Sequence, residues 1–247
     1  MRHPSLVKYT EYVAEATLTR THAGGQWQSE QPVAIFVQEH VPRGNLADFI
    51  QAYGPFEEWV CKYYFHQLLG ALQYIHSQDM VHRDLKPLNL LLDAQFNLKI
   101  TEFGFSCRTK SVHESTYIPG TRQFMAPEMW TGSYNAQEAD LFACGIILFF
   151  MRTGKFPFWE ATNKNSLYLK IIRGEMNAFW SAHEKKYPPG YFSEEFKHLL
   201  NFMFRSEPTM RLNLVEVYCH PWLAIEPLPK EAAIQAHFEV VTNANDD

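Results

Sequence analysis

The spacing of hydrophobic side chains changes early in the chain. Residues 9–21 and 32–38 are rich in β-branched and aromatic side chains, and Gly24 and Gly25 lie between the two segments. Strands favour such side chains and a glycine pair favours a tight connection, so this pattern predicts a β-hairpin. After residue 43 the spacing becomes mostly helical.

Two long helices are predicted from the apolar positions. In residues 56–76 the apolar side chains recur three or four positions apart, at Val60, Tyr64, Leu68, Leu72 and Ile75. This is the stripe of a helix with one buried face. Residues 141–151 form the longest apolar run, which is too short to span a bilayer. We therefore predict a buried core helix over residues 138–152 and no transmembrane segment.

A small hairpin is predicted in the middle of the chain. Residues 90–92 and 98–100 are short apolar segments on either side of the polar stretch 93–97. Asn89 precedes the first segment and Glu102 follows the second. Because antiparallel strands bring their open ends together, we expect these two oxygen-bearing side chains to converge at one place.

The C-terminal part of the chain carries further helix signals. Ser193 precedes Glu194 and Glu195, which is typical of a helix start, and we expect that helix from Phe196. Residues 212–219 predict the last helix of the core. The polar composition beyond them indicates a weakly helical tail.

Composition narrows the class of protein. The 247 residues are 46% hydrophobic and 15% aromatic, which is enough to bury a sizeable core in one or two lobes. The 22 lysines and arginines against 27 aspartates and glutamates give a net charge of −5. No global basic field attracts nucleic acid or acidic lipid, so we expect neither a nucleic-acid nor a membrane partner.

The cysteines and the N-terminus indicate the compartment. The 4 cysteines are widely spaced and form no C-x-x-C pair, so we expect reduced thiols and no zinc site. The N-terminus lacks an apolar stretch with a small-residue cleavage site. We therefore expect a cytoplasmic or nuclear protein that is not secreted.

Three motifs in order identify a family resemblance. Residues 82–89 read HRDLKPLN, residues 102–104 read EFG and residues 126–128 read APE. These resemble the catalytic loop, the metal-binding motif and the end of the activation segment of eukaryotic protein kinases. A lysine two residues after the aspartate resembles the serine/threonine class.

The resemblance covers about residues 1–223 and implies an α+β protein-kinase fold. Residues 1–43 would be a remnant of the β-rich small lobe, with its last two strands and the hinge. Residues 44–223 would form the mainly helical large lobe, and residues 224–247 a C-terminal tail.

The resemblance also assigns roles in ATP-dependent phosphoryl transfer. Asp84 matches the residue that accepts the proton of the substrate hydroxyl, Lys86 the one that faces the γ-phosphate, and Asn89 a ligand of Mg²⁺. Glu102 stands where the family has aspartate as the other metal ligand. Its additional methylene moves the carboxylate by roughly 1 Å, and a displacement of that size can cost about a hundredfold in rate. We expect metal binding to be weakened.

The adenine of ATP would be held at the hinge. The resemblance places it against the backbone carbonyl of Glu39 and the amide of Val41, with Leu91 below it. Gln38 stands at the position that gates the back pocket.

The activation segment and three architectural positions complete the resemblance. Thr116 and Tyr117 lie where kinases carry a phosphorylatable residue, and Arg83 could pair with a phosphate added there. The alternative is a loop whose hydroxyls face water. Thr121 is expected to contact Asp84. The architectural positions are an ion pair and the aspartate that holds the catalytic loop: Glu128, Arg211 and Asp140.

Two expected parts of the family pattern are missing before the hinge. No G-x-G-x-x-G motif and no strand with the nucleotide lysine precede residue 39, so we expect a truncated chain or a start codon placed too late. The expected function is phosphorylation of serine or threonine on protein substrates, feeble or absent in this chain. The alternative is a pseudokinase that acts as a binding scaffold. The oligomeric state stays open.

Overall fold

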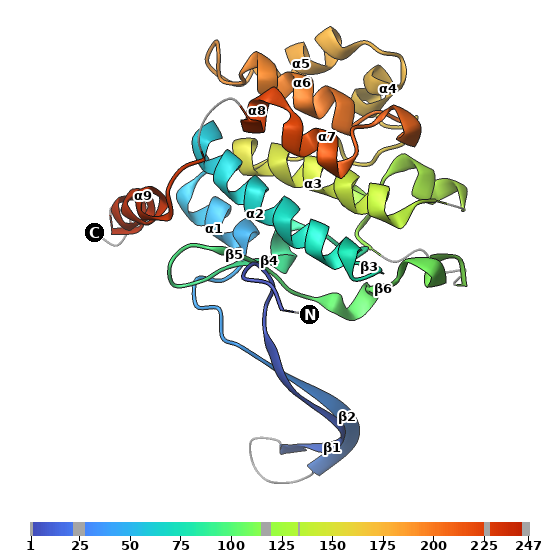
Figure 1. Ribbon diagram of the computed structural model, residues 1–247, viewed down its shortest axis with the longest axis vertical. Coiled ribbons are helices and arrows are strands. Elements are labelled where there is room, and N and C mark those ends of the chain that lie inside the picture. Colours follow the sequence, from blue (N-terminus) through green and yellow to red (C-terminus); the bar gives the residue numbers. More distant parts are fainter. Residues whose placement is uncertain (1, 22–27, 115–119, 133, 225–227, 244–247) are drawn as a thin grey trace.

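The computed structural model describes residues 2–21, 28–114, 120–132, 134–224 and 228–243. It has two unequal parts, a long β-hairpin and a helical lobe, and the hairpin projects away from the lobe (Figure 1). The few strands beside many helices give the α+β class that the sequence predicts.

The hairpin consists of β1 (Tyr9–Thr21) and β2 (Gln28–Gln38), which pair antiparallel. Strand β2 begins four residues before the predicted start, and Pro32 pairs with Thr17 inside it. Proline is tolerated at this place because each strand of a two-stranded sheet has an outer edge where no amide donor is needed.

The lobe is organised around two long helices, α2 (Glu58–Ser77) and α3 (Ala136–Thr153), close to their predicted ranges. They pack side by side through the middle of the lobe (Figure 1). Helix α1 (Leu46–Tyr53) precedes them and is capped by Asn45, whose side chain accepts from the amide of Asp48. The apolar stripe of α2 is completely buried, at Val60, Tyr64, Leu68, Leu72 and Ile75.

Two short sheets lie where the candidate site is built. Strands β4 (Leu90–Leu92) and β5 (Leu98–Ile100) pair antiparallel with the predicted bounds. Strand β3 (Met80–Val81) pairs with β6 (Cys107–Arg108). Short 3₁₀-helices lie between these strands and in the segment that leads to α3: η1 (Pro87–Asn89), η2 (Phe103–Phe105), η3 (Thr109–Glu114), η4 (Arg122–Phe124) and η5 (Pro127–Thr131).

The end of the lobe farthest from the hairpin consists of short helices. They are α4 (Ser166–Ile172), α5 (Met176–Glu184), α6 (Glu194–Met203), η6 (Pro208–Met210), α7 (Leu214–Cys219) and α8 (Pro221–Ala224). Ser193 caps α6 as expected, and the helix begins two residues before the predicted start. The sequence analysis did not find α4 and α5. Among the described residues, no helix combines the length and apolar character needed to cross a membrane.

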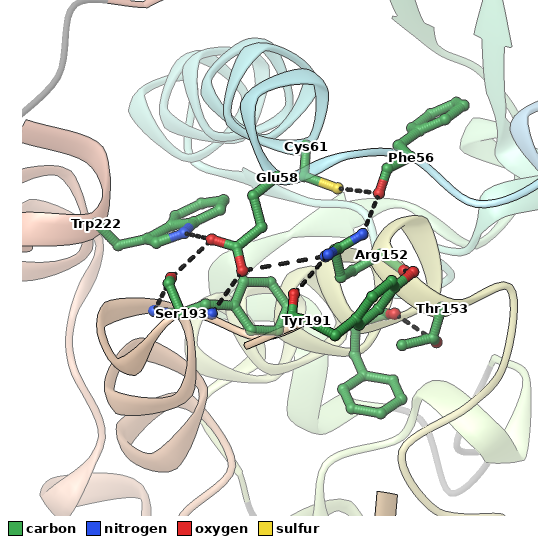
Figure 2. A network of polar contacts seen from close by, with 10 residues as sticks. Phe56, Glu58, Cys61, Arg152, Thr153, Tyr191, Ser193 and Trp222 are labelled. Carbon is green, nitrogen blue, oxygen red and sulfur yellow. Dashed lines mark hydrogen bonds and ion pairs between the residues drawn. The ribbon is translucent and has the colours of Figure 1, made fainter. Parts of the chain in front are cut away.

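Glu58, at the start of α2, joins three distant segments (Figure 2). Its carboxylate accepts hydrogen bonds from the amide and the hydroxyl of Ser193, both at 2.7 Å, and from the indole N–H of Trp222 at 3.1 Å. Arg152 of α3 lies beside it and donates to the backbone carbonyl of Phe56 at 3.1 Å. The network fastens α6 and α8 to the two central helices.

The tail forms helix α9 (Glu231–Asn243), which lies against α1 and α2 on one side of the lobe (Figure 1). Its polar composition predicted only weak helicity. The side chains of Ile234 and Phe238 are fully buried. Packing against the lobe therefore stabilises the helix where local helix propensity is weak.

Candidate active site

The loop of residues 82–89 is held from behind by Asp140 of α3. One carboxylate oxygen accepts from the amide of His82 at 2.9 Å, and the other accepts from the amide of Arg83 at 2.8 Å. Arg83 has a positive φ of 68°, a conformation that costs roughly 1–2 kcal/mol for such a residue. Two buried hydrogen bonds to a carboxylate offset this strain and orient the loop.

Asp84, Lys86, Asn89 and Thr121 meet in one cluster. Oδ1 of Asp84 accepts from the Thr121 hydroxyl at 3.0 Å, and its Oδ2 lies 2.7 Å from Nζ of Lys86. The Asn89 amide donates to Oδ2 of Asp84 at 3.1 Å, and Lys86 donates to the Thr121 hydroxyl at 2.9 Å. Asp84 is only 6% exposed, so its carboxylate sits in a pre-organised, largely dry position.

Asn89 and Glu102 supply oxygen atoms at the open end of the β4–β5 hairpin. Nδ2 of Asn89 donates to the backbone carbonyl of Asp84 at 2.8 Å, which leaves Oδ1 as an oxygen donor for a cation. The amide of Thr101 donates to the carbonyl of Asn89 at 3.0 Å and keeps the two ends together. Glu102 is exposed, with a left-handed backbone at φ 62°. Carboxylate and amide oxygens are the donors that Mg²⁺ takes, so these residues fit the metal.

His82 is a structural residue that the sequence analysis did not single out. Burial lowers the pKa of His82, although the carboxylate of Asp140 and the hydrogen bond to Thr101 raise it. The neutral ring lies 3.0 Å from the carbonyl of Thr101 through Nε2, and its centroid lies 5.0 Å from that of Phe103. His82 thus ties the catalytic loop to the EFG segment. A histidine two residues before Asp84 was the available signal.

Glu39, expected at the hinge, is held through its side chain by Lys8 and Lys99. Burial raises the pKa of Glu39, but hydrogen bonds from the Lys8 amide and the Lys99 ammonium outweigh it and lower the pKa overall. Those bonds, at 2.9 and 3.0 Å, both reach Oε1 of Glu39. Val41 is buried, and Leu91 is the half-buried middle residue of β4.

Gln38, expected at the back-pocket position, is exposed, and its side chain contacts the end of the β4–β5 hairpin. Oε1 of Gln38 accepts from the Thr101 hydroxyl at 3.5 Å. A polar side chain therefore links the end of β2 with the residue before Glu102.

The described part of the activation segment explains how Thr121 reaches Asp84. Gly120 has a φ of 118°, and a Cβ there would lie 2.8 Å from the carbonyl oxygen of Arg83, so only glycine permits this approach. Nε of Arg83 donates to the carbonyl of Phe105 at 2.7 Å. Thr116 and Tyr117 lie outside the described residues.

Glu128 and Arg211 form a two-pronged ion pair. Nη1 and Nη2 of Arg211 each donate to one carboxylate oxygen of Glu128 at 2.6 Å. Nε of Arg211 donates to the carbonyl of Arg205. The side chains are 11% and 4% exposed. The pair joins the APE segment to the segment after α6.

Comparison with known proteins agrees with these motifs. The family model described as the protein kinase domain matches residues 1–223 of this chain. "CBL-interacting serine/threonine-protein kinase 24" of Arabidopsis thaliana is 33% identical over 249 residues, which covers 100% of this chain and 49% of the relative. "CBL-interacting serine/threonine-protein kinase 8" of the same plant is 32% identical over 241 residues, 96% of this chain and 48% of the relative. "CBL-interacting protein kinase 11" of Oryza sativa subsp. japonica is 35% identical over 191 residues, 76% of this chain and 36% of the relative. The chain spans less than half the length of these relatives.

Proposed function

Because this chain belongs to the eukaryotic protein kinase family, of the serine/threonine type, we propose that it transfers the γ-phosphoryl group of ATP to serine or threonine hydroxyls of protein substrates. The observation that supports this most directly is the cluster around Asp84. The Asp84 carboxylate lies within hydrogen-bond reach of the Lys86 ammonium, the side-chain N–H of Asn89 and the Thr121 hydroxyl. Phosphoryl transfer needs little more from a protein than positioning and charge neutralisation.

The hydrogen bonds of Asp84 indicate where a substrate hydroxyl binds. A carboxylate has about four lone-pair sites. Among the described residues, Oδ2 receives Lys86 and Asn89, whereas Oδ1 receives only the Thr121 hydroxyl. The free site is therefore on Oδ1, and there Asp84 accepts the proton of the attacking hydroxyl.

Lys86 and the metal ligands would neutralise the negative charge of the phosphates. The ammonium of Lys86, anchored between Asp84 and Thr121, is placed to neutralise negative charge on the transferred group. Asn89 through Oδ1 and Glu102 through its carboxylate would hold Mg²⁺, which when bound supplies charge neutralisation at the phosphates. The backbone at Glu39 and Val41, with Leu91 beneath, would receive the adenine.

A second candidate function is a pseudokinase scaffold that binds partners without catalysis. Glu102 favours it, because the side chain is longer than the aspartate of active relatives and Mg²⁺ tolerates little change in geometry. The intact cluster of Asp84, Lys86 and Asn89 favours catalysis, so we propose feeble transfer by this chain.

The test is phosphate transfer from radiolabelled ATP to a mixed protein acceptor, followed by phosphoamino acid analysis. We expect label on serine and threonine, and we expect Asp84→Asn to abolish it because the proton acceptor loses its charge. The matched control is Asp79→Asn. Asp79 is exposed with a φ of 57°, a conformation that asparagine adopts readily.

The outcomes separate the two candidate functions. Transfer that survives Asp84→Asn comes from another base or another kinase. A folded wild-type chain that transfers no phosphate at saturating Mg²⁺ and ATP supports the scaffold function instead.

A further inference from the structure

Helix α9 buries one pair of side chains at the turn of the β4–β5 hairpin. Phe238 stacks on Phe96, with ring centroids 5.2 Å apart and planes at 25°. Its ring also meets Phe49 of α1 at 5.1 Å and Phe56 at 5.4 Å. Ile234, four residues earlier and therefore on the same face of the helix, is fully buried as well.

Phe96 is the residue on which this contact acts. It has a φ of 61°, an unfavourable conformation for a bulky side chain that persists only where the surroundings enforce it. One face of its ring lies under the guanidinium of Arg43, 3.6 Å from the centroid, and the ring also stacks on Phe238. Arg43 and α9 therefore hold the turn in its strained shape together.

A polar contact at the same turn strengthens the placement of α9. Nδ2 of Asn97 donates to Oε1 of Glu231, the first residue of the helix, at 3.0 Å. Oδ1 of Asn97 in turn accepts from the hydroxyl of Tyr63 and from the amide of Gln67, both on α2. One asparagine of the turn thus contacts α9 and α2.

The other end of this hairpin carries the candidate metal ligands. Three pairs of strand residues separate the turn at Phe96 from Asn89 and Thr101 at the open end of the hairpin. Thr101 directly precedes Glu102. The hairpin is also tied to the segment after the hinge. The Arg43 amide donates to the carbonyl of Leu92 at 3.2 Å, and the Arg43 guanidinium donates to the carbonyl of Ala94.

We propose that Phe238, with Ile234, is a positioning residue of the candidate catalytic centre. By clamping Phe96, α9 keeps the β4–β5 hairpin in register with the post-hinge segment, so that the metal ligands and the adenine site keep their relative places. The catalytic consequence rests on the proposed function, whereas the mechanical coupling does not.

Hydrogen–deuterium exchange on the full chain tests the coupling without any assay of activity. Phe238→Ala should raise exchange about tenfold at the amides of Leu92 and Thr101, which donate to Gly44 and Asn89. Exchange at the buried centre of α2 around Leu68 should not change, because a local opening does not require global unfolding. Phe238→Leu should restore most of the protection.

The matched control is Val240→Ala on the outer face of α9, where Val240 is 71% exposed. It should leave exchange in the hairpin unchanged. A Phe238→Ala variant whose exchange rises equally in α2 and the hairpin, or rises only within α9, overturns the proposal.

If the chain transfers phosphate, kinetics give a second reading. Phe238→Ala should raise KM for ATP several-fold and lower kcat as well, because the adenine site and the metal ligands both lose their places while Asp84 does not move. A fall in kcat alone contradicts the proposal. If no transfer is seen, the proposed function fails and the exchange result still decides the coupling.

Discussion

In the β1–β2 hairpin, Phe36 and Tyr12 lie against each other with 65% and 58% of their surfaces exposed. In α3, by contrast, Ile146, Ile147 and Leu148 are completely buried. Both segments are rich in apolar residues, but the hairpin has only one layer whereas α3 lies between other helices. A sheet face without a covering layer stays in water however apolar its residues are.

The buried lobe and the exposed hairpin also contribute unequally to the rigidity of the candidate site. Asp84 and Asn89 are oriented by Asp140 on α3 and by the β4–β5 hairpin, all inside the lobe. The long hairpin contributes the exposed Gln38. The geometry around Asp84 is therefore a property of the lobe.

The largest effect is expected from breaking the buried ion pair of the lobe. Arg211→Met leaves Glu128 without its partner, and an uncompensated buried charge costs about 3–5 kcal/mol in the free energy of unfolding. Urea denaturation measures it. Lys197→Met is the control, because the partners of Lys197, Glu184 and Glu194, are exposed and such pairs contribute at most about 1 kcal/mol. Adding Glu128→Gln should recover part of the loss, and a loss equal to that of Lys197→Met would refute the prediction.

Lowering the pH should destabilise the lobe through protonation of His183. Burial lowers the pKa of His183 to about 4, although its hydrogen bond to the carbonyl of Pro157 raises it. The unfolded chain binds the proton at pH values below about 6.5, so stability is lost as pH falls from about 6.5 to 4, by up to about 3 kcal/mol. His183→Gln should flatten this part of the pH profile relative to wild type. Identical profiles of the two proteins would contradict the assignment.

Shortening the carboxylate side chain proposed to bind metal should raise phosphate transfer. Glu102→Asp withdraws the carboxylate by roughly 1 Å, and displacements of that size change rates by up to about a hundredfold. Phosphate transfer by the full chain at saturating Mg²⁺ measures the change, with Glu15→Asp on the exposed β1 strand as the control. An unchanged or lower rate in a folded variant would mean that the site has adapted to glutamate or no longer binds metal.

The smallest effect on stability is expected in the long hairpin. Phe36→Ser should change the free energy of unfolding by less than about 0.5 kcal/mol, because an exposed side chain loses little packing. It should nevertheless reduce self-association, measured by light scattering and by an apolar fluorescent dye. Trp159→Ser is the control, because Trp159 in the lobe is also 65% exposed but lies outside the apolar face of the hairpin. A wild-type chain that is monodisperse and dye-silent at high concentration would disprove the prediction.

Local signals in the sequence alone determined much of the fold. The apolar stripe of α2, the run of α3 and the segments of β4 and β5 each form from neighbours in the chain, so their types and approximate ranges were predictable. The HRDLKPLN motif also identified Asp84, Lys86 and Asn89, which lie together in the structure, because its order and spacing reflect one known arrangement.

Only the tertiary structure decided the long-range contacts. Glu58 meets Ser193 and Trp222 across 135 and 164 residues, and nothing in the residues around Glu58 distinguishes it from a solvated glutamate at a helix start. Phe238 likewise lies in a polar segment whose sequence predicted only a weak helix. Local spacing reports which face of an element is apolar, but it contains no information on which distant element covers that face. The physical reason is that packing couples residues through space, so the partner of Phe238 exists only once β4, β5 and α1 have been assembled.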